Sequence, residues 1–297
     1  MVILKSLLSL LRTIAFLPLL YMSNASADIV LLIHGFDNHA MTWEQSGINQ
    51  YLHQQGWYFQ GVLNDNGHSV VLQPSGSGVS PGQSKHTDNK LYTVNLASRA
   101  PIEYQSQQLR KMIHWLNQVH PAEPIYLVGH SAGGLVARYT IVQLFQQQPH
   151  NEHPGQIAGL ISIAAPHLGT YRAAQAIDEF DEPFFCPGPG WRVLQSVFGG
   201  YEYDLVKESK GLLYELHPSR PYNLTFWLNE QPHPNIPYFS VVRASGDFMV
   251  PGYSQDMNNV PALKNQSITL RSHTEHFLNP QDAVTIHSIL TSLTGTL

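Results

Sequence analysis

Residues 125–135 read Ile-Tyr-Leu-Val-Gly-His-Ser-Ala-Gly-Gly-Leu and decide the fold class of this 297-residue chain. The apolar run 125–128 predicts a short buried strand, and apolar residues at helical spacing over 135–145 predict a helix after it. Two glycines flank Ser131, so the serine is expected in a tight turn between strand and helix, with its hydroxyl exposed above the end of a sheet. This strand–turn–helix unit is typical of a nucleophilic serine in an α/β protein.

The five-residue pattern Gly-x-Ser-x-Gly is weak evidence by itself, and a second copy occurs at 78–82. There Ser80 is followed by Pro81 within a Gly- and Ser-rich stretch, and no helical pattern begins. We therefore interpret Ser80 as a loop residue and Ser131 as the candidate nucleophile.

Strand-like and helix-like patterns alternate along the rest of the chain. This alternation predicts an α/β fold with a mostly parallel central sheet and helices on both faces. Two stretches interrupt it: 74–97 is rich in Gly, Ser, Pro and Asn, and 171–235 is rich in aromatic residues and Pro. Because long irregular stretches are often functional, we expect 171–235 to form a cap or lid insertion. The other expected strands are 29–33, 69–72, 160–164, 238–242 and 268–270, and the other expected helices are 43–57, 98–119 and 283–293.

Composition sets limits on the class of protein. The chain is 43% hydrophobic and only 12% charged, with 16 Lys+Arg, 21 Asp+Glu and a formal net charge of -5. A chain this apolar can bury a sizeable core, which excludes disorder. Basic residues are few and scattered, so we expect no nucleic-acid partner. His residues also number 16, so the net charge is expected to climb as the pH falls through about 6.5.

The N-terminal 27 residues have the pattern of a secretory signal peptide. Two cations, Lys5 and Arg12, precede the apolar run 13–21, and Ala-Ser-Ala at 25–27 offers a cleavage site before Asp28. A membrane anchor is disfavoured because the uninterrupted apolar run is shorter than the ~20 residues of a spanning helix. The sequence therefore predicts 28–297 as a secreted or periplasmic domain with no permanent membrane span after cleavage.

A serine nucleophile needs a histidine base that is oriented by a carboxylate. In proteins with this turn the partners follow in the order Ser, acid, His, after late strands. Asp247 comes directly after the strand 238–242 and is the preferred acid, with Asp256 as the alternative. His276 is preferred as the base over His273, because it precedes the closing helix, although His273 lies nearer the end of the last strand.

An oxyanion hole is expected from two backbone amides. One is the amide after the nucleophile, on Ala132, and the other comes from the loop after the first strand. His34-Gly35-Phe36 occupies that loop, so the amide of Phe36 is the second candidate.

Five blocks together resemble the lipases and esterases of the α/β-hydrolase superfamily, and most of all the secreted bacterial triacylglycerol lipases. They are IVLLIHGF (29–36), YLVGHSAGGLVARY (126–139), LISIAAPHLGT (160–170), the segment around Asp247, and HFLNP (276–280). The resemblance implies an ester or lipid substrate and contact with a lipid–water interface. It also implies that His167, in the Pro-His-x-Gly-Thr segment, is structural.

Some secreted lipases also bind calcium and contain a disulfide near the active site, and neither feature carries over. The chain has one cysteine, Cys186, and Glu275 and Asp282 do not reproduce the calcium pattern. The cluster His-Asn-Glu-His at 150–153 is more typical of a solvated loop than of a metal site. We therefore expect no cofactor and no metal.

The sequence thus predicts a secreted serine hydrolase that cleaves carboxylic esters through Ser131, Asp247 and His276. A thioesterase or a polyester depolymerase with the same residues is the alternative within hydrolases. A catalytically silent binding protein of the same fold is disfavoured, because binding alone does not require all three residues. The aromatic residues of 171–235 could bind acyl chains or pack a small core of their own, so lipase and esterase both stay open.

Overall fold

The computed structural model describes residues 27–74, 88–147, 156–181, 199–218 and 220–295, and within these ranges eight strands form one sheet. The strand order is β3-β2-β4-β1-β5-β6-β7-β8. β3 is antiparallel to β2 at one edge, and every other neighbouring pair is parallel, which confirms the predicted α/β class. The strands are β1 (Ile29–Ile33), β2 (Tyr58–Asp65), β3 (Val70–Gln73), β4 (Lys90–Asn95), β5 (Ile125–His130), β6 (Ile157–Ile163), β7 (Tyr238–Arg243) and β8 (Ser267–Ser272).

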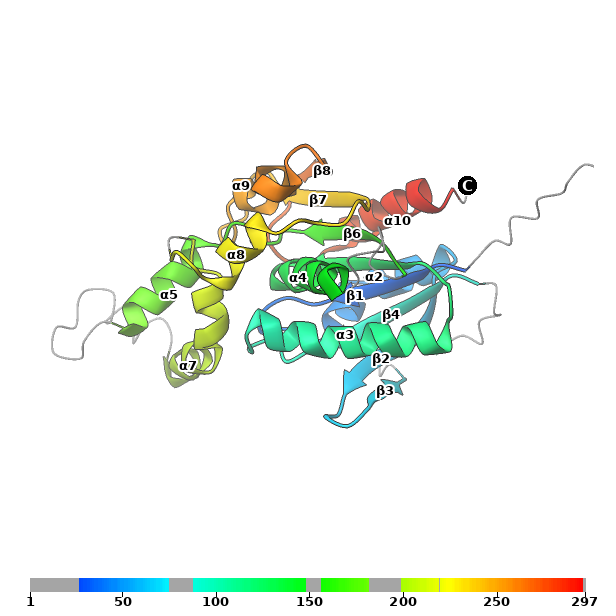
Figure 1. The fold of residues 1–297 in the computed structure, drawn as a ribbon, viewed down its shortest axis with the longest axis horizontal. Coiled ribbons are helices and arrows are strands. Elements are labelled where there is room, and N and C mark those ends of the chain that lie inside the picture. The colour runs from blue at the N-terminus through cyan, green and yellow to red at the C-terminus, as the bar shows by residue number, and fades with distance from the viewer. Residues whose placement is uncertain (1–26, 75–87, 148–155, 182–198, 219, 296–297) are drawn as a thin grey trace, which may run out of the picture.

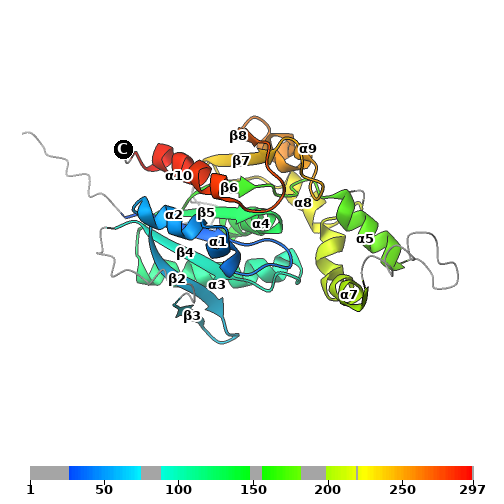
Figure 2. The same cartoon turned by 180° about the vertical axis from the view of Figure 1, so that it is seen from behind.

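Helices cover both faces of the sheet. α3 and α4 lie on the face that Figure 1 presents, and α1, α2 and α10 lie on the opposite face that Figure 2 presents. The central strands are therefore shielded on both sides, and every residue of β1 and β5 is buried. These helices are α1 (Met41–Gln45), α2 (Ile48–Gln54), α3 (Ile102–Val119), α4 (Ala132–Gln147) and α10 (Pro280–Thr294).

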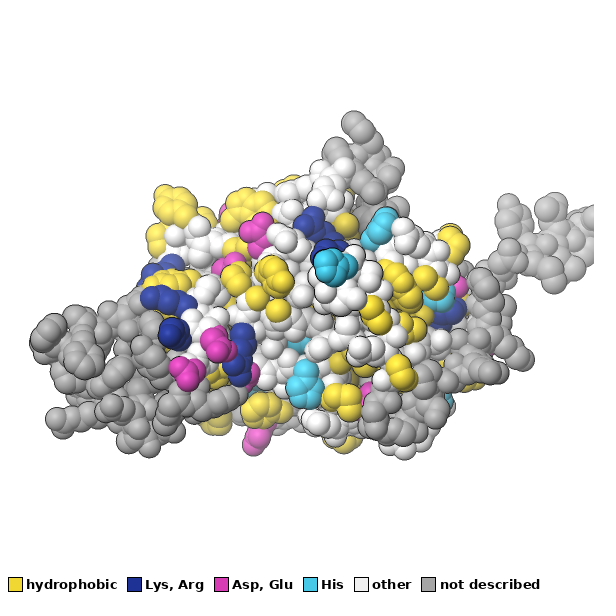
Figure 3. Space-filling view, turned by 90° about the horizontal axis from the view of Figure 1, so that it is seen from below, with side chains coloured by type: hydrophobic (Ala, Val, Ile, Leu, Met, Phe, Trp, Pro, Cys, Tyr) yellow, Lys and Arg dark blue, Asp and Glu magenta, His cyan; other side chains and the backbone are white. Residues whose placement is uncertain are grey.

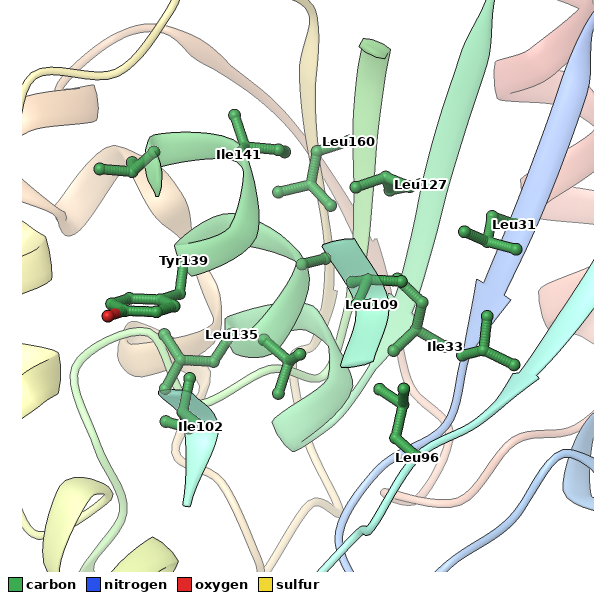
Figure 4. Close-up of a cluster of buried hydrophobic side chains, with 14 of the residues drawn as sticks. Leu31, Ile33, Leu96, Ile102, Leu109, Leu127, Leu135, Tyr139, Ile141 and Leu160 are labelled. Atoms are coloured by element: carbon green, nitrogen blue, oxygen red, sulfur yellow. The ribbon is translucent and has the colours of Figure 1, made fainter. Parts of the chain in front are cut away.

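The hydrophobic core is divided by the sheet into two clusters. Figure 4 shows the first, in which Leu31 and Leu127 of the sheet lie near Leu109 of α3 and Leu135 of α4. The second cluster lies under α1, α2 and α10 and includes the fully buried Trp43. Because α4 directly follows the Ser131 turn, its packing into the first cluster fixes the direction in which that turn leaves the sheet.

Two strands differ from the sequence prediction. β2 and β4 were not expected, and β4 lies inside the stretch 74–97 that was interpreted as irregular. The expected helix 43–57 is two short helices, separated at Gly47 with a φ of 79°. The six strands and the other three helices predicted from the sequence are present, with bounds shifted by a few residues.

The described part of 171–235 contains three further helices. They are α5 (Tyr171–Asp181), α7 (Gly199–Glu215) and α8 (Leu224–Glu230), and α5 and α7 project beyond one end of the sheet (Figures 1 and 2). Another short helix, α9 (Gly252–Gln255), and two 3₁₀ turns, η1 (Met257–Asn259) and η2 (Pro261–Leu263), lie between β7 and β8.

On the face shown in Figure 3, hydrophobic side chains and the white atoms of other side chains and backbone cover more of the described surface than Lys, Arg, Asp and Glu do. This agrees with the low charged fraction of the sequence. None of the helices in the described ranges is long and apolar enough to cross a membrane. Ser80, Cys186, the cluster 150–153 and the expected signal peptide up to residue 26 lie outside the described residues.

Candidate active site

Ser131 lies in the turn between β5 and α4, in a strained backbone conformation. Its φ is 53°, in the left-handed region that non-glycine residues rarely adopt. The amide N–H of Ser131 donates to the carbonyl oxygen of Ile163 on β6 at 2.9 Å, which ties the turn to the neighbouring strand. A Cβ on Gly129 would lie 2.5 Å from Cα of Gly134, so only glycine lets the helix turn back so closely over the strand.

The loop after β1 lies against the serine. A Cβ on Gly35 would lie 2.8 Å from Cβ of Ser131, so a side chain there would displace the serine. His34 holds this loop: its Nε2 accepts from the amide of Leu96 at 3.0 Å and its Nδ1 donates to the carbonyl oxygen of Gly35 at 3.1 Å. Burial lowers the pKa of His34 to about 4, so the ring is neutral at pH 7.

His276 and Asp247 complete a hydrogen-bonded chain to the serine. Nε2 of His276 lies 2.9 Å from Oγ of Ser131, and Nδ1 of His276 lies 2.8 Å from Oδ2 of Asp247. Because the carboxylate accepts the Nδ1 proton, Nε2 of the neutral ring is free to accept the serine hydroxyl. The structure therefore brings together the three preferred residues of the sequence analysis.

The Asp247 carboxylate is held as an acceptor by several donors. Oδ1 accepts from the amides of Met249 at 2.8 Å and Val250 at 2.9 Å, and Oδ2 accepts from Nε2 of Gln255 at 3.0 Å. Burial by itself would raise the pKa of Asp247, but the hydrogen bond from His276 and those from the two amides outweigh it and hold this pKa below its ordinary value. Asp247 is therefore ionised at neutral pH. The sequence did not predict the contact of Gln255 with Asp247, because Gln255 lies in no recognised motif.

The two alternative residues lie elsewhere. His273 is exposed, and its Nδ1 lies 3.0 Å from Oγ of Ser245. Asp256 caps the 3₁₀ turn η1 through the amide of Asn258 and also accepts from Oγ1 of Thr269 at 2.9 Å. Neither side chain contacts Ser131.

A second histidine, His130, contacts the backbone of His276. His130, which precedes the serine, is buried, and its Nε2 donates to the carbonyl oxygen of His276 at 2.9 Å. Burial and the neighbouring His276 lower the pKa of His130 to about 3, so this ring stays neutral. The sequence placed His130 in the motif but carried no signal for this contact, which spans 146 positions of the chain.

The two amides proposed for the oxyanion hole are available. Phe36 and Ala132 both border the same cavity as Ser131 and His276. Among the described residues, neither amide N–H has a hydrogen-bond acceptor. Ala132 is the first residue of α4, so its N–H has no partner within the helix.

Ser131 and His276 border a cavity of about 330 Å³. Its wall is mostly apolar and is contributed in large part by α5 and α7. The residues that line it, besides the four just named, are Pro166, Thr170, Arg172, Ala173, Gln175, Ala176, Leu205, Val206, Leu213, Leu216, Met249 and Val250.

His167 and Asp282 have structural contacts. Nε2 of His167 lies 2.8 Å from Oγ of Ser162 in the interior, and His167 does not border the cavity. Asp282 forms a buried ion pair with Arg243 at 2.7 Å, and Glu275 is exposed. Across the part of the chain that the structure describes, no group of three or more His, Cys, Asp or Glu side chains could hold a metal ion.

The fold and the serine turn define a class, the α/β hydrolases. The chain belongs to the alpha/beta hydrolase family, whose pattern matches residues 30–285. No curated protein matches the sequence.

Solved structures of low sequence identity share the fold. A Bacillus licheniformis lipase, BlEst2 in its mature form, is 10% identical with a TM-score of 0.52, and the match covers 90% of this chain and 92% of that one. A metagenomic carboxyl esterase is 13% identical with a TM-score of 0.51, over 92% of this chain and 77% of that one. A gene product of Listeria innocua is 12% identical with a TM-score of 0.52, over 91% and 92%.

Proposed function

We propose that the protein is a carboxylic ester hydrolase that works through an acyl-enzyme on Ser131. The observation that carries this proposal is the continuous chain of hydrogen bonds from Asp247 through His276 to Ser131, which ends at an apolar cavity. The fold is shared with a lipase and a carboxyl esterase, which supports the same reaction class for this chain.

In the first half of the reaction Ser131 attacks the ester carbonyl carbon while Nε2 of His276 takes the hydroxyl proton. The Asp247 carboxylate keeps the Nδ1 proton in place and stabilises the imidazolium that forms. The amides of Phe36 and Ala132 donate to the oxyanion, each contributing about 3 kcal/mol. His276 then gives its proton to the departing alcohol, which leaves an acyl group on Ser131.

In the second half a water molecule attacks the acyl carbonyl, and Nε2 of His276 takes its proton. The tetrahedral intermediate collapses when His276 returns a proton to Oγ of Ser131, which releases the carboxylic acid. The apolar wall from α5 and α7 accommodates the acyl chain during both halves.

A fluorophosphonate probe tests the nucleophile. We expect covalent labelling of the purified protein and none of the Ser131→Ala variant. Equal labelling of both proteins would contradict Ser131 as the nucleophile. No labelling of either would contradict the proposal and favour a silent binding protein.

A chain-length series of p-nitrophenyl esters, followed by the matching thioesters and a soluble polyester oligomer, tests the substrate class. We expect the oxygen esters to give the highest kcat/KM. A higher value for thioesters or polyesters would favour the alternative hydrolase functions.

We further propose that this site works at a lipid–water interface. Three exposed apolar side chains directly follow Asp247 or His276 in the sequence. Phe248 is 81% exposed, Phe277 is 66% exposed and Met249 is 43% exposed. Exposed apolar side chains of this kind can bury their surface against lipid. Activity on triglyceride should therefore rise when the substrate exceeds its solubility, and a Phe248→Ser/Phe277→Ser variant should reduce this rise.

We also propose that 1–27 is a secretory signal peptide and that 171–235 forms a cap over the site. The signal peptide is proposed from the charge and apolar pattern of the N-terminus. The cap is supported by the cavity residues that α5 and α7 supply. N-terminal sequencing of exported protein should begin at Asp28, and any other start would contradict this cleavage site.

A further inference from the structure

Among the described side chains that line the cavity at Ser131, one has a formal charge, and it is positive. Arg172 borders the cavity, and none of the other lining residues is Asp, Glu, Lys or Arg. A ligand that reaches Ser131 therefore enters a site whose described wall contains a cation and no carboxylate that would repel an anion. Such a site favours a negatively charged group on the ligand.

The contacts of Arg172 with described residues do not neutralise its charge. Nε donates to the carbonyl oxygen of Phe248 at 3.1 Å, and Nη1 donates to Oε1 of Gln175 at 3.4 Å. Both acceptors are neutral, and the described acidic residues form no ion pair with Arg172. A guanidinium has five N–H donors, so three remain available for a ligand. Arg99 and Arg243, in contrast, pair with carboxylates.

A positive charge at the position of Arg172 does not stabilise its helix. Arg172 is the second residue of α5, in the first helical turn. A cation there is unfavourable, since the N-terminal end of a helix carries partial positive charge. The hydrogen bond from Nε to Phe248 directs the side chain across to the loop that follows Asp247, and the bond from Nη1 reaches Gln175 within α5. Together they hold the guanidinium beside the site at the expense of helix stability.

We propose that Arg172 binds an anionic group on the alcohol part of the ester substrate. The substrate class is an ester of an apolar acid with an alcohol that carries a phosphate or a carboxylate. This assignment rests on the proposed ester hydrolysis. The apolar wall from α5 and α7 takes the acyl chain, and the exposed Arg172 at the mouth of the cavity meets the charged alcohol part. The planar guanidinium fork can bind either anion with two hydrogen bonds.

A matched pair of substrates tests this inference. 1-Octanoylglycerol 3-phosphate and 1-octanoylglycerol have the same acyl chain and differ only in the phosphate, and both are used as monomers in solution. We expect a kcat/KM about tenfold higher for the phosphate ester, since a charge-assisted contact contributes at least this much. 3-O-Octanoylglycerate, measured alongside, distinguishes a preference for carboxylate from one for phosphate.

Variants of Arg172 separate its charge from its packing. Arg172→Gln should bring the ratio of the two kcat/KM values close to one, and Arg172→Lys should retain part of it. Arg271→Gln is the matched control, because Arg271 is exposed on β8 and does not border the cavity. This control should keep the ratio of the unchanged protein. Added salt should lower that ratio, because an exposed charge is screened.

Two results would overturn the inference while the proposed function stands. One is hydrolysis of both octanoyl esters by the unchanged protein with equal kcat/KM. The other is an Arg172→Gln variant that keeps the full ratio. Hydrolysis of none of the three esters, nor of p-nitrophenyl octanoate, would overturn the inference and the proposed function together.

Discussion

His276 is fixed at three atoms, which together set the direction of its ring. Nδ1 is bound to Asp247, Nε2 contacts Ser131, and the backbone carbonyl oxygen accepts from His130. The first two contacts set the tautomer that accepts a proton, and the third fixes the loop that carries the ring. Replacements of His276 and of His130 should therefore have effects of different kinds.

His276→Ala should reduce kcat by about 10⁴- to 10⁶-fold, because it removes the base. His273→Ala should keep most of the activity, since the exposed His273 contacts Ser245 and not the nucleophile. Initial rates on p-nitrophenyl butyrate measure both. The opposite order of activities would identify His273 as the base.

His130→Phe should lower kcat by up to about 100-fold with a much smaller change in KM, because a shift of the base by about 1 Å has this effect. His130→Gln, which can still donate to the carbonyl oxygen of His276, should recover part of the loss. The melting temperatures of both variants are measured together with kcat and KM, so that a loss of stability is distinguished from a loss of activity. If His130→Gln were as inactive as His130→Phe and equally stable, the positioning role would be wrong.

Among the elements, β7 and α10 are joined by a buried ion pair behind the loop of His276. Nη2 of Arg243 lies 2.7 Å from Oδ2 of Asp282, and both side chains are almost completely buried. The same carboxylate accepts from the amide of Asn279, which caps α10. Nη1 of Arg243 also donates to Oγ of Ser272 at the end of β8 at 2.9 Å, so the pair contacts both ends of the segment between β8 and α10.

Asp282→Ala should destabilise the fold by about 3–5 kcal/mol, because it leaves the Arg243 charge buried without a partner. Denaturant unfolding measures this change. A double variant, Arg243→Met with Asp282→Leu, should recover most of the loss, because no buried charge remains. A double variant as unstable as the single one would show that the capping of α10, and not the ion pair, supplies the stability.

A second link between elements titrates near neutral pH. Glu215, near the end of α7, accepts from the amide of Ile102 at the start of α3 at 2.6 Å. Burial raises the pKa of Glu215 to about 7, against the hydrogen bond from Ile102, and the nearby Glu103 raises it further. A raised carboxyl pKa stabilises the fold fully below the unfolded pKa of about 4.3, and this stability is lost as the pH rises through about 7.

Glu215→Gln removes this titration and keeps an acceptor for Ile102. The measured quantity is the melting temperature of the variant minus that of the unchanged protein. This difference should be greater at pH 8 than at pH 5, by on the order of 3 °C. Melting curves at the two pH values, with Glu208→Gln on the exposed part of α7 as the control, measure it. A difference that does not change with pH would show that Glu215 does not titrate in this range.

The elements that the sequence missed have polar or irregular residues. β4 contains Lys90 and Thr93, both buried, and Lys90 is neutralised by Glu123 at 2.9 Å, a partner 33 residues away. β2 has a bulge at Gly61 with a φ of 137°. Apolar periodicity detects neither strand, because both depend on contacts distant in the chain.

The sequence singled out Phe36, Ser131 and Asp247 as candidates because each lies shortly after an apolar strand pattern. The choice between His273 and His276 depended on how α10 packs against β7. Sequence could only favour one of them. Arg172 and Gln255 were not found at all, because single polar residues in irregular stretches carry no periodic signal.

At the scale of the whole molecule, the low charge of the sequence is accompanied by histidines that are buried and neutral. Four of the histidines that the structure describes have depressed pKa values, in each case mainly because of burial. The value is about 4 for His34 and about 3 for His130 and His233, and it lies well below the ordinary value for His167. The rise in net charge expected as the pH falls through 6.5 is therefore restricted in the folded state.

This difference between folded and unfolded chains should make the protein sensitive to acid. A depressed histidine pKa stabilises the fold above the unfolded pKa of about 6.5, and this stability is lost as the pH falls towards the folded value. Each histidine contributes a slope of up to about 1.4 kcal/mol per pH unit. The raised pKa values of Asp28, about 6, and Glu215, about 7, act in the opposite direction but involve fewer groups.

The free energy of unfolding should therefore fall by several kcal/mol between pH 7 and pH 5, which is a large part of the stability of an ordinary domain. Urea unfolding at half-unit steps of pH measures it. His233→Gln should reduce the slope below pH 6, because it removes one buried titrating group, whereas His273→Gln, at an exposed position, should leave the slope unchanged. A free energy of unfolding that stays constant from pH 7 to pH 5 would mean that the buried histidines take up protons in the folded protein.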